Sequence, residues 1–201
     1  EAFRTGLRRY LKRYAYGNAQ TADLWAALSE ASGLDVARIM APWTLDVGFP
    51  LVSVEDDNSG KGLDKIRLEL SQERFIAGGG ELSAEEARQL WSIPLRVATD
   101  KAPVPELHGM ADLLDTRKRT IELPGDIQHV KVNAGQAGFY RVRYPERWMA
   151  RLGEAVEGGQ LAAADRIGIV ADAHALSVAG RLPLTALLDL VIHYRGEQDY
   201  T

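Results

Sequence analysis

Hydrophobic residues in the first 49 positions recur with the spacing of amphipathic helices. The first set lies at i, i+4, i+7, i+8 and i+11 and comprises Phe3, Leu7, Tyr10, Leu11 and Tyr14, which therefore share one helix face. Thr21 is a candidate N-cap for a second helix that Gly33 would end. Asp35 is suited to cap a third, short helix, which Pro42 is expected to kink or end. The start of the chain is thus predicted to be entirely helical.

From Pro50 onward the period of the pattern changes from 3.6 to 2. Alternating runs occupy 50–56, 64–75, 90–99, 117–123, 128–133 and 138–144. Short strands divided by Gly, Pro and Asp turns predict an antiparallel β-sandwich rather than a parallel α/β sheet. Between the second and third runs, Ser83 and Glu86 form a capping-box pattern, which predicts a helical turn within 77–89.

The helical period returns after Pro145, which is expected to lie in the first turn of a helix. Three apolar faces follow and consist of Trp148, Leu152 and Val156; Ile167, Val170, Ala173 and Leu176; and Leu184, Leu187, Leu188 and Val191. These helices look cut off from a longer helical region, which would leave the last face without its normal cover, so we expect self-association through the 145–201 helices. The predicted fold class is α+β in several parts: helices, a central antiparallel sandwich, and helices again.

Helical periodicity is already running at Phe3, and the chain ends at Thr201 without a terminating feature. We interpret the chain as an internal fragment of a longer protein.

Composition and charge exclude several classes of function. The chain has no cysteine, which excludes disulfides, thiolate catalysis and thiolate metal sites. A net charge of −4 and a pI near 5.6 give no reason to expect nucleic acid or an anionic membrane as a partner. No apolar run approaches the ~18 residues of a membrane span. The absence of cysteine, together with three asparagines of which none lies in an N-x-Ser/Thr sequon, fits a cytoplasmic protein.

The four histidines do not form a helical zinc motif. Two imidazoles reach one metal when they are four residues apart on a helix. The residues four positions after His108, His129, His174 and His193 are Asp112, Asn133, Val178 and Glu197. His193 and Glu197 would share a helix face, and we interpret them as a structural or surface pair. His129 lies in an alternating run and is expected to face solvent.

Other candidate sites are equally incomplete. Asp56, Asn58 and Gly60 have the spacing of a calcium loop, but Arg67 stands where the bidentate acid belongs, so a hairpin turn is predicted. The glycines at 78–80 lack the context of a phosphate loop. Two carboxylate pairs can be named, Glu69 with Glu73 and Asp165 with Asp172, without a pocket to support either. We therefore assign no catalytic, cofactor-binding or metal-binding residue.

Several blocks of the sequence carry a family resemblance when they are taken together and in order. They are FRTGLRRYLKRYAYGNAQTADLWAALSEASG and VARIMAPWTLDVGFPLVSV in the first quarter, then LSQERF, WSIPLRVAT, VKVNAGQAGFYRVRYPERW, DRIGIVADAHALSVAG and YRGEQDY. These blocks resemble the zinc aminopeptidases of the gluzincin clan, a family that includes the puromycin-sensitive, alanyl and endoplasmic-reticulum aminopeptidases. The resemblance covers nearly the whole chain.

The resemblance implies a parent enzyme that removes N-terminal residues from peptides with a zinc-bound water. It places the H-E-x-x-H motif, the loop that binds the substrate amine and the catalytic tyrosine before Glu1, so Tyr10, Tyr14 and Tyr16 receive no catalytic role. It assigns 1–49 to the last helices of the catalytic domain, 50–144 to a bridging β-sandwich, and 145–201 to the first helices of a superhelical domain. The fragment is then expected to hold no zinc and to be inactive, with peptides as substrates of the parent and the rest of the parent chain as its partner.

Two alternatives remain open at this point. The sandwich could be a non-enzymatic interaction module that binds a partner through an edge strand. A different enzyme with an unrecognised site would need a concave pocket with converging titratable groups.

Overall fold

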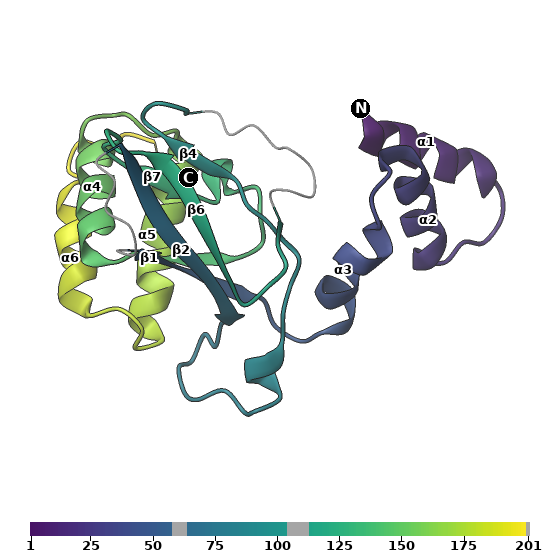
Figure 1. Cartoon of the computed structure of the whole chain (residues 1–201), viewed down its shortest axis with the longest axis horizontal. Coiled ribbons are helices and arrows are strands. Elements are labelled where there is room, and N and C mark those ends of the chain that lie inside the picture. Colours follow the sequence, from purple (N-terminus) through teal and green to yellow (C-terminus); the bar gives the residue numbers. More distant parts are fainter. Residues whose placement is uncertain (58–63, 104–112, 200–201) are drawn as a thin grey trace. The chain divides into compact units, whose positions relative to one another are not determined.

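The structure is a computed structural model that describes residues 1–57, 64–103 and 113–199. The chain divides into two compact units, Glu1–Val47 and Gly48–Thr201. Each unit is described by itself (Figure 1).

The first unit consists of three helices: α1 (Ala2–Arg13), α2 (Thr21–Ser32) and α3 (Val36–Leu45). Helices α1 and α2 cross closely at Gly6, where a Cβ atom would lie 2.9 Å from Leu28 Cδ2. Only a residue without a side chain fits at this crossing. Across the same helix pair, Arg13 forms an ion pair with Glu30 at 3.0 Å.

The boundaries of these helices agree with the predictions at two positions and differ at two. The Asp35 side chain accepts the Arg38 backbone N–H, as an N-cap does, and Gly33 ends α2 in the left-handed conformation. The predicted cap Thr21 is wrong by one residue, because Gln20 is the N-cap of α2 and forms a reciprocal capping box with the residue at N3. Pro42 lies inside α3 and does not end it.

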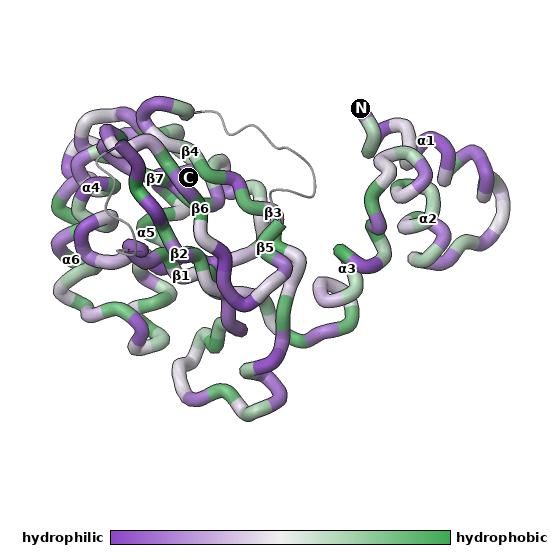
Figure 2. The backbone as a smooth tube through the Cα atoms, viewed as in Figure 1, coloured by the Kyte–Doolittle hydropathy of each residue, from purple (hydrophilic) through white to green (hydrophobic). Residues whose placement is uncertain are grey.

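In the second unit, the described residues that precede the last helices form β strands arranged in three sheets. The strands are β1 (Pro50–Asp56), β2 (Lys65–Arg74), β3 (Ile93–Pro94), β4 (Val97–Thr99), β5 (Leu113–Leu114), β6 (Lys118–Pro124), β7 (Val130–Val132) and β8 (Arg141–Arg143). The largest sheet has the order β6-β2-β1-β8, and β3-β5 and β4-β7 form the two-stranded sheets. In the first part of β2, residues 65–70, hydrophobic and hydrophilic positions alternate (Figure 2). The chain therefore has an α+β fold.

The strand predictions are wrong in three respects. Strand β8 pairs parallel to β1, so the large sheet is mixed rather than antiparallel. A parallel partner requires a long crossover connection, which the chain between β1 and β8 supplies. The single run predicted at 90–99 is divided into β3 and β4, which belong to different sheets, and β5 had no signal beyond two leucines.

Among the described residues of the β region, two short 3₁₀ turns interrupt the strands, η1 (Glu86–Arg88) and η3 (Ala134–Gln136). The helical turn predicted from the capping box is confirmed at η1. The Ser83 N–H donates to the Glu86 carboxylate at 2.9 Å, and the Glu86 N–H donates to Ser83 Oγ at 3.2 Å.

Three helices complete the second unit: α4 (Glu146–Glu157), α5 (Ala163–Val178) and α6 (Leu184–Ile192). Pro145 is the N-cap of α4, one position before the predicted first turn. Two expected faces are only partly correct, because Ile167 is exposed on α5 and Leu187 is buried on α6. Leu51 of β1, Phe75, and Leu176 of α5 pack together with Ala179, so the core continues from the large sheet onto α5.

None of the helices in the described ranges combines the length and the hydropathy that a membrane span needs.

Candidate functional site

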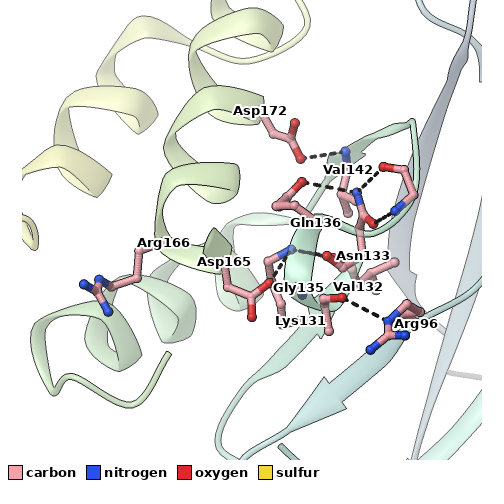
Figure 3. A network of polar contacts seen from close by, with 12 residues as sticks. Arg96, Lys131, Val132, Asn133, Gly135, Gln136, Val142, Asp165, Arg166 and Asp172 are labelled. Carbon is pink, nitrogen blue, oxygen red and sulfur yellow. Dashed lines mark hydrogen bonds and ion pairs between the residues drawn. The ribbon is translucent and has the colours of Figure 1, made fainter. Parts of the chain in front are cut away.

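A network of polar contacts in the second unit surrounds two buried aspartates on one face of α5. Asp165 and Asp172 are two helical turns apart and retain only 8% and 5% of their exposure. Both side chains point from α5 toward the segment that runs from β7 through η3 to β8 (Figure 3). We call Asp165 and Asp172 the carboxylate pair.

Each member of the carboxylate pair binds one backbone N–H and one cation. Asp165 Oδ1 accepts the Gly135 N–H at 2.7 Å and lies 3.6 Å from Lys131 Nζ. Asp172 Oδ2 accepts the Val142 N–H at 3.1 Å, and its Oδ1 accepts Arg141 Nη1 at 3.1 Å. Charge-assisted bonds of this kind are stronger than bonds between neutral groups.

Lys131 is almost completely buried, with 1% of its surface exposed. Its ammonium group also donates to the Val132 carbonyl at 2.7 Å and to the Asn133 carbonyl at 3.2 Å. A buried charge is tolerated only when it is paired and hydrogen-bonded, and all these contacts are needed for that.

Asn133 and Tyr144 fix the backbone around this lysine. Asn133 has a left-handed φ of 60°, and its amide donates to the Gly138 carbonyl at 3.0 Å while its Oδ1 accepts the Gly138 N–H at 2.8 Å. The Tyr144 hydroxyl accepts the Val132 N–H at 2.8 Å and donates to the Val132 carbonyl at 3.3 Å. Tyr144 thereby ties the end of β8 to β7, which belongs to another sheet.

The turn η3 lies directly against α5 at Gly168. A Cβ atom on Gly168 would lie 1.5 Å from Nε2 of Gln136, so any side chain there would displace the glutamine. The Gln136 Oε1 accepts the Asn133 amide at 3.2 Å. Close approach of turn and helix therefore depends on a residue without a side chain at this position.

Burial changes the acid–base properties of the network. It raises the pKa of the Asp172 carboxyl, an effect that Arg141 and the Val142 N–H oppose. It lowers the pKa of the Lys131 ammonium group, against the attraction of Asp165 and Asp172. It also raises the pKa of the Tyr144 phenol well above its ordinary value. In each case removal from water disfavours the charged form.

This geometry favours a structural role over catalysis. The carboxylates are bound to backbone amides and cations, and they are buried, so neither is placed to transfer a proton to a substrate. Across the ranges that the structure describes, no three His, Asp or Glu side chains lie together in a way that could hold a metal ion. The described residues therefore do not fit a zinc site.

Two of the histidine predictions are wrong. His129 is 4% exposed rather than solvent-facing, and its Nδ1 has no hydrogen-bond partner among the described residues. Burial lowers the pKa of its imidazole, which Asp100 partly opposes. The following residues, Val130–Val132, are all buried, so both faces of this strand are covered. The alternation of hydrophobic and polar residues in the sequence therefore does not show whether His129 faces solvent.

His193 does not pair with Glu197, because α6 ends at Ile192. Instead His193 Nδ1 lies 2.7 Å from Glu157 Oε2. Glu197 binds Arg166 at 2.5 Å, and this hydrogen bond lowers the pKa of the Glu197 carboxyl to about 2. In Figure 3 the Arg166 side chain points away from the carboxylate pair.

The remaining sequence candidates do not converge on a site. His174 is exposed on α5, and His108 lies outside the described residues. The expected hairpin at 55–62 lies partly outside them as well, because 58–63 are not described. Glu69 binds Lys118 at 2.7 Å and Glu73 binds Arg181, so the two glutamates serve separate cations.

A hollow of about 440 Å³ lies between α4 and α6. Met149 and Leu190 are buried at its lining, and the carboxylates of Glu146 and Asp189 stand among its exposed residues. His193 also lines it, but its ring is bound to Glu157. The lining thus offers no nucleophile paired with a base.

Lys131, Asn133 and Tyr144 were missed in the sequence because each stands in an ordinary strand pattern. One signal was available for their partners: Asp165 and Asp172 share a helix face with Ile169 and Leu176, which are buried. Acidic residues on an apolar helix face indicate buried polar partners.

Comparison with known sequences shows similarity along the whole chain. A sequence model described as the Peptidase family M1 domain matches residues 1–43, and one described as the ERAP1-like C-terminal domain matches residues 129–201.

Aminopeptidase 2 of Candida albicans is 39% identical over 100% of this chain and 20% of its own length. Aminopeptidase M1-A of rice (Oryza sativa subsp. japonica) is 35% identical over 100% of the chain and 22% of its own length. The puromycin-sensitive aminopeptidase of Caenorhabditis elegans is 34% identical over 98% of the chain and 20% of its own length. The chain thus spans about a fifth of the length of the curated relatives it matches.

Proposed function

We propose that this chain belongs to the M1 family of aminopeptidases and is an internal part of a zinc-dependent enzyme that removes N-terminal residues from peptides. One observation supports this most strongly. A relative named as an aminopeptidase aligns with the chain from end to end at 39% identity. The two family models match in the same chain order, one at each end.

In this proposal the chain supplies architecture and the rest of the parent supplies the chemistry. Residues 1–49 are the last helices of the catalytic domain, 50–144 a bridging β-sandwich, and 145–201 the first helices of a superhelical domain. The described residues offer no fit to zinc, so zinc would be held by the parent and not by this chain. The chain alone would be inactive.

The proposed partners follow from the same reading. The parent acts on peptides in the cytoplasm, in peptide catabolism, although one relative is named Aminopeptidase 2, mitochondrial. The chain itself contacts the rest of the parent, with no role for nucleic acid or membrane. When the rest of the parent is absent, we expect copies of the chain to associate through the exposed apolar residues of α6. Leu184 and Leu188 of this helix are 61% and 55% exposed.

The interaction-module alternative receives little support from β6, an edge strand of the large sheet. Lys118 and Glu122 are exposed on this strand and bind Glu69 and Lys65. Charged side chains on an edge strand oppose pairing with a further strand.

The test is an aminopeptidase assay on the full-length protein that contains this chain. We expect hydrolysis of alanine- or leucine-p-nitroanilide that 1,10-phenanthroline abolishes and added zinc restores. The 201-residue chain in the same assay is the matched control and should release no p-nitroaniline. Absence of chelator-sensitive activity in the full-length protein, or turnover by the chain alone, would overturn the proposal.

A further inference from the structure

Helix α5 is attached to two different sheets through the carboxylate pair. Asp165 binds Gly135 and Lys131, which lie in the turn after β7 and in β7 itself, and β7 pairs with β4. Asp172 binds Arg141 and Val142 of β8, which pairs with β1 in the large sheet. One rigid helix therefore holds β7 and β8, which belong to two different sheets, at a fixed separation.

Helix α4 is fixed to the large sheet at a separate place. The fully buried Trp148 donates its indole N–H to Asp56 Oδ1, at the end of β1, at 2.9 Å. Arg151, one turn further on, donates to the Ile127 carbonyl at 3.1 Å. The turn between β8 and α4 is thus bracketed by fixed contacts, with Tyr144 bound to β7 on one side and Trp148 bound to β1 on the other.

We propose that the sheets and helices α4–α6 form one cooperative body held by the carboxylate pair, with no flexible joint between β8 and α4. This inference concerns the chain itself and does not depend on the proposed zinc activity. In a parent enzyme it would mean that the β region and the first helices after it move together, and that bending at residues 144–146 is prevented. The boundary suggested by the change of periodicity at Pro145 is then not a mechanical boundary.

Two buried tryptophans allow the inference to be tested in the intact chain. Trp91 lies in the β region and Trp148 in α4, and both are 0% exposed. Fluorine NMR of the 201-residue chain labelled with 5-fluorotryptophan, with resonances assigned by single Trp→Phe variants, follows each site during urea unfolding. We expect the native signals of Trp91 and Trp148 to disappear with the same midpoint, because one body unfolds as a whole.

Substitutions then test whether the carboxylate pair causes the coupling. Asp172→Asn should lower the midpoints at Trp91 and Trp148 together by about 1–2 M urea, because Arg141 loses its charged partner. Asp189→Asn is the matched control: Asp189 is exposed on α6 and has no ion pair among the described residues, so no shift is expected. Tyr144→Phe removes the hydroxyl that binds Val132 of β7, and it should also lower both midpoints.

Three results would overturn the inference. The first is a difference in midpoint between Trp91 and Trp148 in the unsubstituted chain, which needs no variant to fold. The second is a fall at Trp148 alone after Asp172→Asn. The third is a shift after Asp172→Asn no larger than that after Asp189→Asn.

Discussion

Replacement of Trp148 by phenylalanine tests the contact that fixes α4 to the large sheet. The indole is completely buried, donates to Asp56 Oδ1 at 2.9 Å, and lies under the guanidinium groups of Arg147 and Arg151, 4.9 and 5.1 Å from the ring centre. Phenylalanine keeps an aromatic ring in the same place. It lacks the N–H and part of the indole surface.

The expected loss of stability follows from these contacts. A hydrogen bond to a charged acceptor contributes about 1.5–3 kcal/mol. The smaller ring gives up roughly 40 Å² of buried apolar surface, or about 1 kcal/mol. The weaker attraction of the two arginines to the smaller ring adds about 0.5 kcal/mol. We therefore expect Trp148→Phe to destabilise the second unit by about 3–4.5 kcal/mol, before any relaxation of the site.

Urea unfolding at 25 °C, followed by far-UV circular dichroism, measures this loss. A double-mutant cycle with Asp56→Ala isolates the hydrogen bond, and its coupling energy should be about 1.5–3 kcal/mol. Trp25→Phe, at a half-buried position of the first unit, is the control and should leave the transition of the second unit unchanged. A loss below about 1 kcal/mol for Trp148→Phe, or a coupling energy near zero, would refute the reasoning.

Three further predictions concern other parts of the chain. Because burial lowers the pKa of His129, the unfolded chain binds the proton more readily than the folded chain. Stability in denaturant melts should therefore fall as the pH is lowered from about 7 to 5, and His129→Gln should flatten that slope; an unchanged slope contradicts the account. Gly168→Ala should cost about 1–3 kcal/mol by displacing Gln136, and Gln136→Gly in the same chain should recover most of it; no recovery contradicts the account. Sedimentation velocity of the 201-residue chain should show concentration-dependent association, which Leu188→Lys should reduce. A monomer at every concentration would contradict the prediction that α6 mediates self-association.

Predictions from sequence succeeded where structure depends on neighbours in the chain. Asp35 caps its helix and the Ser83–Glu86 pair forms its capping box because both involve hydrogen bonds within one turn. Gly33 ends α2 for an equally local reason. The change of period at Pro50 also marks the first strand correctly, since β1 begins at that residue.

Features that depend on distant contacts could not be read in this way. The parallel pairing of β8 with β1 is decided by the whole chain between them, and no local pattern distinguishes it from an antiparallel edge. His129 and Lys131 are buried because other elements cover both faces of β7, which the alternation of one strand does not reveal. The roles of Asp165 and Asp172 likewise become visible only once η3 and β8 lie beside α5.

The zinc content of the purified proteins tests the central claim most directly. Elemental analysis of the full-length protein that contains this chain should give about one zinc per molecule, as expected for a catalytic site with three protein ligands. The 201-residue chain, purified in the same buffer, should contain far less than one. Stoichiometric zinc in the isolated chain, or none in an active full-length protein, would contradict the proposal that this segment provides the architecture of an aminopeptidase and not its metal site.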